Sequence, residues 1–192
     1  MTLHAHFEAL YAADDDPWAV RYAWYERRKR ALLLASLGNE RYRSAFEPGC
    51  GNGEMSAALA ARCERLLACD GAAAAVAAAQ RRLHGADPSM VRIEQRSLPA
   101  QWPQDERFDL IVISELAYYF DAATLESMLV QACAMLEPGG ELALCHYLHD
   151  FDDRVTATDA AHALADRMPG VKRVVHHRER DFLLEIWRKD AP

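Results

Sequence analysis

The sequence lacks the marks of several special classes of protein. Its five cysteines are odd in number and include no C-x-x-C pair, so neither a disulfide framework nor a metal site is expected. No apolar run approaches the ~20 residues that cross a bilayer, and no basic-then-apolar leader opens the chain. Basic residues are outnumbered, 22 Lys plus Arg against 29 Asp plus Glu, which argues against nucleic-acid binding. We expect a soluble, cytoplasmic protein with no membrane or nucleic-acid partner.

What the sequence does contain, from residue 43 onward, is an alternation of short apolar segments and helical segments. The apolar segments predict strands at 45–47, 66–69, 91–95, 110–113 and 141–147. The segments between them predict helices at 54–63, at 72–83, from a cap at Asp121 or Thr124 to 136, and at 157–168. The last two strands, 171–176 and 182–187, are too closely linked for a parallel crossover and predict an antiparallel hairpin. The expected fold is α/β: a Rossmann-like, doubly wound, mostly parallel seven-stranded sheet with an antiparallel C-terminal hairpin strand.

A helix is also predicted before this alternation. Trp18, Tyr22 and Tyr25 recur at i, i+4 and i+7, and the apolar stripe continues to a stop signal at Gly38. Pro17 follows three aspartates, which suits a helix start, because proline is tolerated in the first turn and acids favour its positive end.

The loop after the first predicted strand has the composition of a ligand site. Glu47 is followed by Gly49, Gly51 and Gly53, and glycine lets the backbone turn sharply and lie against a ligand. Open α/β sheets bind ligands at the carboxyl ends of their strands. Asp70 ends the next predicted strand, where an acid can accept hydrogen bonds from both hydroxyls of a ribose. The alternative for Asp70 is a capping role for the following helix, and the two roles can coexist.

Two cofactor classes fit this loop, a nicotinamide dinucleotide and S-adenosylmethionine. The dinucleotide fingerprint G-x-G-x-x-G/A, counted from Gly49, puts Glu54 in its last place, where a carboxylate would repel the pyrophosphate. S-adenosylmethionine carries no phosphate, and its ammonium group suits the carboxylate of Glu47. The spacing therefore favours S-adenosylmethionine.

At this point the chain resembles the class I S-adenosylmethionine-dependent methyltransferases. The stretches that carry the resemblance are 47–53, Asp70, 108–112 and 136–140. A narrower resemblance, to the nodulation protein S (NodS-like) methyltransferases, covers nearly the whole chain and is carried by 16–18, 24–29, 98–103, 114–120, 145–147 and 181–184. The best-known members of that family N-methylate a free amino group on the terminal glucosamine of a chitooligosaccharide. We expect an N-terminal helical cap over 1–40 and a methyltransferase domain over 41–192, forming a single compact unit.

The resemblance also implies roles for individual residues at the cofactor. Glu47 would hold the methionine ammonium and Asp70 the ribose, while Ser97 stands near the adenine where many relatives have an acid. The N-terminal helix would form a lid, with Tyr25 as its contact. The implied cofactor-binding residues are Glu47, Gly49, Cys50, Gly51, Gly53, Asp70, Gly71, Ser97, Leu98, Ser114 and Tyr25.

Catalysis of amine methylation needs a neutral nucleophile, so a nearby proton acceptor is useful. Glu115, which would lie beside the reactive methyl, is the first candidate, and His146 is the second. The alternatives are that Glu115 only anchors local backbone and that His146 is structural. The residues expected to contact the acceptor are Trp18, Tyr118, Tyr119 and His149, although aromatic residues at helical spacing can equally be core.

The predicted function is an S-adenosylmethionine-dependent N-methyltransferase, with S-adenosylhomocysteine as its second product. Its acceptor would be the free amine of a deacetylated amino sugar, an oligosaccharide or a similar small amine, and the protein would be a monomer or weak dimer. An O-methyltransferase for a small metabolite and a non-catalytic module that binds the cofactor both stay open. A nicotinamide oxidoreductase is a more distant alternative.

Overall fold

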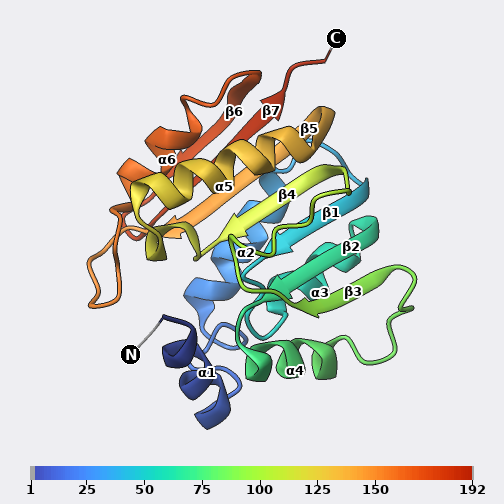
Figure 1. Cartoon of the computed structure of the whole chain (residues 1–192), viewed down its shortest axis with the longest axis vertical. Coiled ribbons are helices and arrows are strands. Elements are labelled where there is room, and N and C mark those ends of the chain that lie inside the picture. The colour runs from blue at the N-terminus through green and yellow to red at the C-terminus, as the bar shows by residue number, and fades with distance from the viewer. Residues whose placement is uncertain (1–2, 192) are drawn as a thin grey trace. The chain divides into compact units, whose positions relative to one another are not determined.

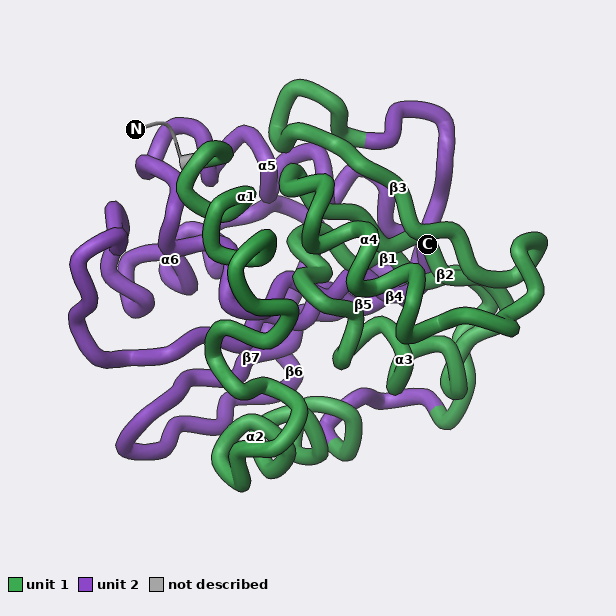
Figure 2. The backbone as a smooth tube through the Cα atoms, turned by 90° about the horizontal axis from the view of Figure 1, so that it is seen from below, with its two compact units in different colours: residues 1–35, 40–102 green, residues 36–39, 103–192 purple. Residues whose placement is uncertain are grey.

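The computed structural model describes residues 3–191, and within them the chain forms six α-helices and seven strands. Two compact units share these elements: residues up to 35 with 40–102, and residues 36–39 with the chain from 103 onward (Figure 2). In chain order the first unit holds α1 (Leu3–Ala13), α2 (Trp24–Ser36), β1 (Tyr42–Pro48), α3 (Glu54–Ala60), β2 (Cys63–Asp70), α4 (Ala73–Arg82) and β3 (Val91–Gln95). The second holds β4 (Phe108–Ser114), the 3₁₀ turn η1 (Ala117–Tyr119), α5 (Ala122–Met135), β5 (Leu136–Tyr147), α6 (Thr158–Ala165), β6 (Val171–Arg178) and β7 (Phe182–Lys189).

The strands of the first unit lie in the order β3-β2-β1 and are all parallel. β1 and β2 are buried over most of their length, and most of their buried side chains are apolar, as in a sheet covered by helices. Helix α3 packs on β2, and α4 packs on β2 and β3. The parallel register brings the carboxyl ends of β1 and β2 to one edge, with Glu47 paired to Ala68 and Pro48 to Cys69.

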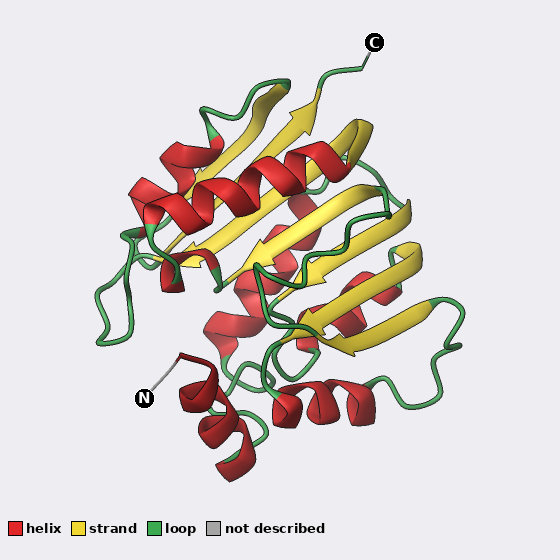
Figure 3. Cartoon of the chain, in the orientation of Figure 1, coloured by secondary structure: helices red, strands yellow, loops and turns green. Residues whose placement is uncertain are grey.

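The second unit has the order β4-β5-β7-β6, in which β4 and β5 are parallel and β7 is antiparallel to both of its neighbours. Helices α5 and α6 lie on the same face of these strands (Figures 1 and 3). The run Leu110–Ile113 is completely buried, which explains why the sequence has four apolar residues in succession there. Asp121 accepts a hydrogen bond from the amide of Thr124 and caps α5.

The predicted fold class is confirmed: the strands are mostly parallel, and those at the C-terminus are antiparallel. The hairpin predicted from the short link between the last two strands is present as β6 and β7. Strand β5 begins at Leu136, five residues before the predicted start, and the parallel register with β4 shifts between Phe108 and Leu110. Among residues 3–191, no helix combines the length and the apolar character that crossing a membrane requires.

The N-terminal region is where the prediction of helices was wrong. The helix predicted from residue 18 begins only at Trp24, and Ala19 has a left-handed backbone with φ 52°. The side chain of Asp16 accepts hydrogen bonds from the amides of Val20 and Arg21, which holds the segment as a turn instead. A helix that was not predicted, α1, precedes this turn, and Trp18 packs its ring against Phe7 and Tyr11 of α1.

Candidate functional site

The glycine turn between β1 and α3 depends on three left-handed residues. Gly49, Gly51 and Gly53 have φ of 72°, 52° and 80°, a region that glycine adopts without steric cost. The amides of Gly49 and Cys50 both donate to the carbonyl of Cys69, at 2.8 and 2.9 Å, and so tie the turn to β2. A Cβ on Gly53 would lie 2.9 Å from the Cα of Ala79, so this position also permits close packing against α4.

Asp70, the last residue of β2, connects the glycine turn to α4. Its Oδ2 accepts from the amide of Gly51 at 3.0 Å, and its Oδ1 accepts from the amide of Ala72 at 2.9 Å. Burial raises the pKa of Asp70, although these amide hydrogen bonds act in the opposite direction. Each carboxylate oxygen has two lone pairs, so holding the turn leaves Asp70 able to accept from a diol as well. The capping alternative and the ligand role are therefore compatible in this geometry.

Glu47 is a buried carboxyl group, 3% exposed, one residue before the end of β1. Burial is the main cause that raises its pKa from 4.5 to about 8, with a smaller contribution from the charge of Asp70. The hydroxyl of Ser56 donates to its Oε2 at 2.5 Å and lowers the pKa in part. A cation placed against Glu47 would stabilise the ionised form. The pair Glu47 and Asp70 thus fits a ligand that has an amino group at one end and a ribose diol at the other.

Glu54, at the start of α3, faces three guanidinium groups. Its carboxylate lies 2.6 Å from Arg82, 3.6 Å from Arg30 and 3.8 Å from Arg21. Because these cations offset its charge, the repulsion of a pyrophosphate that the sequence predicts for Glu54 is weaker than expected. The geometry of this residue alone does not separate the two cofactor classes.

Helix α1, which was not predicted from the sequence, lies over the glycine turn within the first unit. A Cβ on Gly51 would meet the Tyr11 hydroxyl at 2.4 Å, and one on Gly71 would lie 3.3 Å from Nδ1 of His4. The amide of Ala74 donates to Glu8 at 3.4 Å. The spacing of Phe7, Leu10 and Tyr11, at i, i+3 and i+4, is the signal that would have found this helix.

The remaining residues predicted at the cofactor lie on separate elements. The amide of Ser97 donates to the side chain of Gln101 at 2.6 Å, in the loop after β3 that also holds Leu98. Burial raises the pKa of the Cys50 thiol, so this residue is not a reactive thiolate. Tyr25 is in α2, with the ammonium of Lys29 4.8 Å from its ring centroid. The cofactor roles of these residues stay predictions.

In the second unit, Glu115 follows β4 in a left-handed conformation, with φ 53°. Its Oε2 accepts from the Tyr118 hydroxyl at 2.6 Å and from the Tyr147 amide at 3.0 Å. Such backbone strain in a residue other than glycine is characteristic of functional sites. The carboxylate anchors backbone, as the structural alternative predicted, and in addition holds a phenol. Ser114, the last residue of β4, pairs in register with Cys145 of β5.

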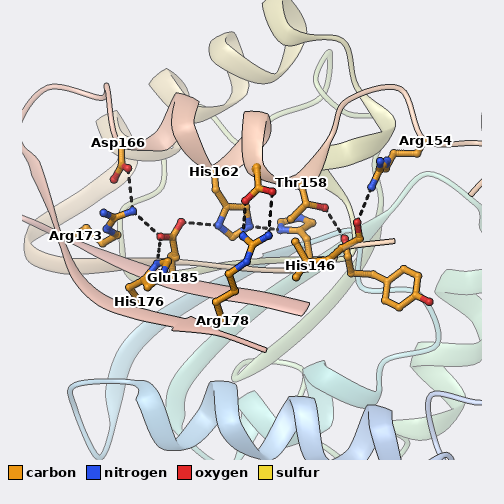
Figure 4. Close-up of polar contacts among 12 residues, drawn as sticks. His146, Arg154, Thr158, His162, Asp166, Arg173, His176, Arg178 and Glu185 are labelled. Atoms are coloured by element: carbon orange, nitrogen blue, oxygen red, sulfur yellow. Dashed lines mark hydrogen bonds and ion pairs between the residues drawn. The ribbon is translucent and has the colours of Figure 1, made fainter. Parts of the chain in front are cut away.

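His146 is fully buried, and both of its ring nitrogens have partners inside the second unit (Figure 4). Its Nε2 accepts from the amide of Ala117 at 3.1 Å, and its Nδ1 lies 3.0 Å from Nε2 of His162. A role as proton acceptor would require one of these hydrogen bonds to break. His149, by contrast, is on the surface, where its Nε2 lies 2.8 Å from Oδ1 of Asp181.

The aromatic residues predicted at the acceptor differ in their exposure. Tyr118 is 5% exposed and packs edge-on against Tyr119 and Phe151, with ring centroids 4.8 and 4.9 Å away. It is therefore mostly core, as the alternative held. Tyr119 is partly exposed, and burial together with the charge of Glu115 raises its pKa. Trp18 belongs to the first unit and is 45% exposed.

A mostly parallel seven-stranded sheet with antiparallel C-terminal strands, a glycine turn after β1, a buried acid beside that turn and a second acid ending β2 is the arrangement typical of the class I S-adenosylmethionine-dependent methyltransferases. Residues 45–140 match the model of the methyltransferase domain family, and the chain belongs to this family. No group of three or more His, Cys, Asp or Glu placed to hold a metal ion occurs in the part of the chain that the structure describes.

Comparisons with individual proteins place the chain more narrowly within the methyltransferase family. The chain is 34% identical to nodulation protein S of Rhizobium tropici over 132 residues, which are 68% of this chain and 54% of that protein. The chain thus spans about half the length of this curated relative. It is 48% identical to a candidate methyltransferase from Pseudomonas syringae of known structure, with a TM-score of 0.75, covering 87% of this chain and 100% of that one.

A further solved structure is the N-methyltransferase NodS from Bradyrhizobium japonicum WM9 in complex with S-adenosyl-L-homocysteine. It is 25% identical to this chain, covers 97% of each chain and has a TM-score of 0.84. At the level of the family, the predicted methyltransferase class, its S-adenosylmethionine cofactor and the NodS-like resemblance are confirmed.

Proposed function

We propose that this chain is an S-adenosylmethionine-dependent N-methyltransferase whose acceptor is the free amine of a deacetylated amino sugar, an oligosaccharide or a similar small amine. The observation that carries the proposal is the pair of acids on either side of the glycine turn, the buried Glu47 and the partly buried Asp70. The likeness to NodS, over 97% of both chains, supports N-methylation as the reaction.

The residues at the cofactor hold its two polar ends. When bound, S-adenosylmethionine supplies a methyl group that its sulfonium has already activated. Glu47 binds the ammonium and Asp70 the ribose hydroxyls, and backbone atoms of 49–53 and Gly71 line the ligand. Ser97 and Leu98 contact the adenine, while Tyr25 and Ser114 complete the predicted set. Desolvation of both acids, complete at Glu47 and partial at Asp70, supports this assignment, because a desolvated carboxylate interacts strongly with a cation or a hydroxyl.

The residues at the acceptor orient the amine and remove its proton. An ammonium cannot attack, so the nucleophile must reach the methyl as a neutral amine. Glu115 accepts the amine proton, and the hydrogen bond from Tyr118 fixes the orientation of its carboxylate. Tyr119, His149 and Trp18 would contact the rest of the acceptor.

Methyl transfer from labelled S-adenosylmethionine to glucosamine oligomers, with and without their acetyl groups, tests the proposal. We expect transfer only to oligomers that have a free amine. Glu115→Gln should lower kcat about 100-fold or more, because general base catalysis contributes ~10²–10⁴-fold. Glu126→Gln, on the exposed surface of α5, is the matched control.

Other outcomes would replace the proposal. Transfer to hydroxyl groups of fully acetylated oligomers would make the chain an O-methyltransferase. Cofactor binding with no transfer to any amine or alcohol would indicate a non-catalytic binding module.

A further inference from the structure

A continuous line of polar side chains crosses the interior of the second unit. It consists of His146 on β5, His162 on α6 and Glu185 on β7, which are 0%, 2% and 2% exposed (Figure 4). His146 Nδ1 lies 3.0 Å from His162 Nε2, and His162 Nδ1 lies 2.8 Å from Glu185 Oε2. We call these three residues the buried relay. Apolar side chains of similar volume often stabilise a core as well as a buried polar network does, so stability is a weak explanation for the relay.

One backbone amide determines the protonation of the whole relay. The N–H of Ala117 can only donate, and it points at His146 Nε2 from 3.1 Å, so this nitrogen carries no proton. A neutral imidazole then has its proton on Nδ1, from which His146 donates to His162 Nε2. His162 must in turn be protonated on Nδ1, from which it donates to Glu185. Both rings are thus the Nδ1–H tautomer, and neither can take a second proton without breaking a hydrogen bond.

The outer end of the relay is a stable anion. Glu185 Oε1 lies 2.6 Å from Arg173 and 2.5 Å from Nδ1 of His176, both on β6 and partly exposed. Burial acts to raise the pKa of Glu185, but the hydrogen bonds from His162 and His176, together with the charge of Arg173, lower it. An ionised carboxylate can only accept hydrogen bonds. Every hydrogen bond of the relay is therefore donated in the same direction, from the Ala117 amide toward Glu185 on β7.

The inner end of the relay holds the turn that carries the acceptor residues. Ala117 is the first residue of η1, and Tyr118, the next residue, donates its hydroxyl to Glu115. The same turn is held from the other side, because the Tyr118 carbonyl accepts from the amides of Val155 and Thr156. A rotation of η1 would therefore move the hydroxyl that orients the Glu115 carboxylate.

We propose that His146, His162 and Glu185 are positioning residues, which fix the η1 turn and through it the Tyr118 hydroxyl and the Glu115 carboxylate. This inference rests on the proposed function for the role of Glu115, and it replaces the proton-acceptor role that the sequence suggested for His146. A buried network with every member satisfied specifies one arrangement, which suits a site where the direction of a lone pair matters.

Glu185→Gln tests the relay from its far end. Arg173 and His176 would keep the amide oxygen of the new side chain and turn its NH₂ toward His162. This donor would invert both tautomers and place a proton on His146 Nε2, against the Ala117 amide. We expect long-range nitrogen–proton NMR spectra of the unliganded wild type to show the Nδ1–H tautomer at both rings. In Glu185→Gln they should show a changed tautomer and faster hydrogen exchange at Ala117.

These spectra need neither cofactor nor acceptor, so they are independent of the proposed function. An Nε2–H tautomer of His146 in the wild type would overturn the proposal, as would unchanged exchange of the Ala117 amide in Glu185→Gln. A wild type that methylates no amine would overturn the proposed function and leave the positioning of η1 to be judged by the spectra.

Kinetics then separate positioning from a merely structural role. His146→Leu should lower kcat about tenfold or more and leave the affinity for S-adenosylhomocysteine unchanged, since the residues assigned to the cofactor ends are in the first unit. His146→Gln should recover most of the loss, because its amide oxygen can accept from Ala117. His177→Gln, at a partly exposed histidine of β6 outside the relay, is the control. A lower melting temperature with unchanged kcat, or a Gln variant no better than Leu, would overturn the assignment.

Discussion

Burial destabilises the ionised form of Glu47 in the folded protein, and a cationic ligand can offset this effect. Its pKa rises from 4.5 to about 8, chiefly because it is buried, so without a cationic ligand the folded protein holds a proton there at neutral pH. Between these two values, unfolding releases that proton. The contribution of Glu47 to the free energy of unfolding therefore falls as the pH rises from 4.5 to 8. Binding of an ammonium group requires the opposite, ionised form.

We expect the affinity of the wild type for S-adenosylhomocysteine to rise between pH 6.5 and 8, by at most about tenfold per unit. Glu47→Gln should bind weakly with no such rise, and it should gain stability relative to the wild type as the pH increases. Calorimetric titration and chemical unfolding at several pH values measure the two effects, with Glu8→Gln on α1 as a control for nearby charge. Affinity that is independent of pH in the wild type would show that Glu47 does not meet the ammonium.

The position of a single residue in the fold could be predicted where a residue of suitable chemistry stands at the end of a predicted strand. The placement of Glu47 and Asp70 at the glycine turn could be predicted because each acid ends a predicted strand, and their roles toward the cofactor stay predictions. The buried relay could not be found in this way. His162 and Glu185 are 23 residues apart on a helix and a strand, and only the packing of α6 on β7 brings them together.

At the scale of elements, periodicity predicted the interior well and the N-terminus poorly. The run Leu110–Ile113 is apolar throughout and buried on both faces, as predicted for a central strand. The helix predicted from Trp18 failed because the side chain of Asp16 competes for the amides of Val20 and Arg21. Such local competition depends on side-chain geometry, which an apolar period does not encode.

The cap of α5 gives a prediction at this scale. Asp121 accepts from the Thr124 amide at 2.8 Å, and the hydrogen bonds from Thr124 lower its pKa. Asp121→Ala leaves this amide without its acceptor and should lower the melting temperature by roughly 2–4 °C at neutral pH. The difference should shrink as the pH falls through the pKa of Asp121, since the protonated acid is a weaker acceptor. Asp121→Asn should retain most of the stability; equal melting temperatures for Ala and wild type would exclude a capping role.

For the whole molecule, the fold class was predictable because strands and helices alternate with apolar strands and short links. The cofactor class was harder to predict. The fingerprint argument relied on a repelling charge at Glu54, and three arginines compensate that charge in the folded unit. What distinguishes the two cofactors is the set of groups that each must satisfy: an ammonium and a diol in one case, a pyrophosphate in the other.

Ligand-induced stabilisation tests this distinction on the intact chain. S-adenosylhomocysteine at 100 times its Kd should add about 2.7 kcal/mol to the free energy of unfolding, which is ~5–10 °C in melting temperature for a chain of this size. NAD at the same concentration should add nothing. Asp70→Ala should bind tenfold more weakly or worse, because two hydroxyl contacts are lost, and should therefore keep only about half of the shift or less. Asp105→Ala, on an exposed loop, should keep all of it. A shift with NAD that equals the shift with S-adenosylhomocysteine would show that the glycine turn holds a pyrophosphate, and Asp70 would then bind the ribose of a dinucleotide.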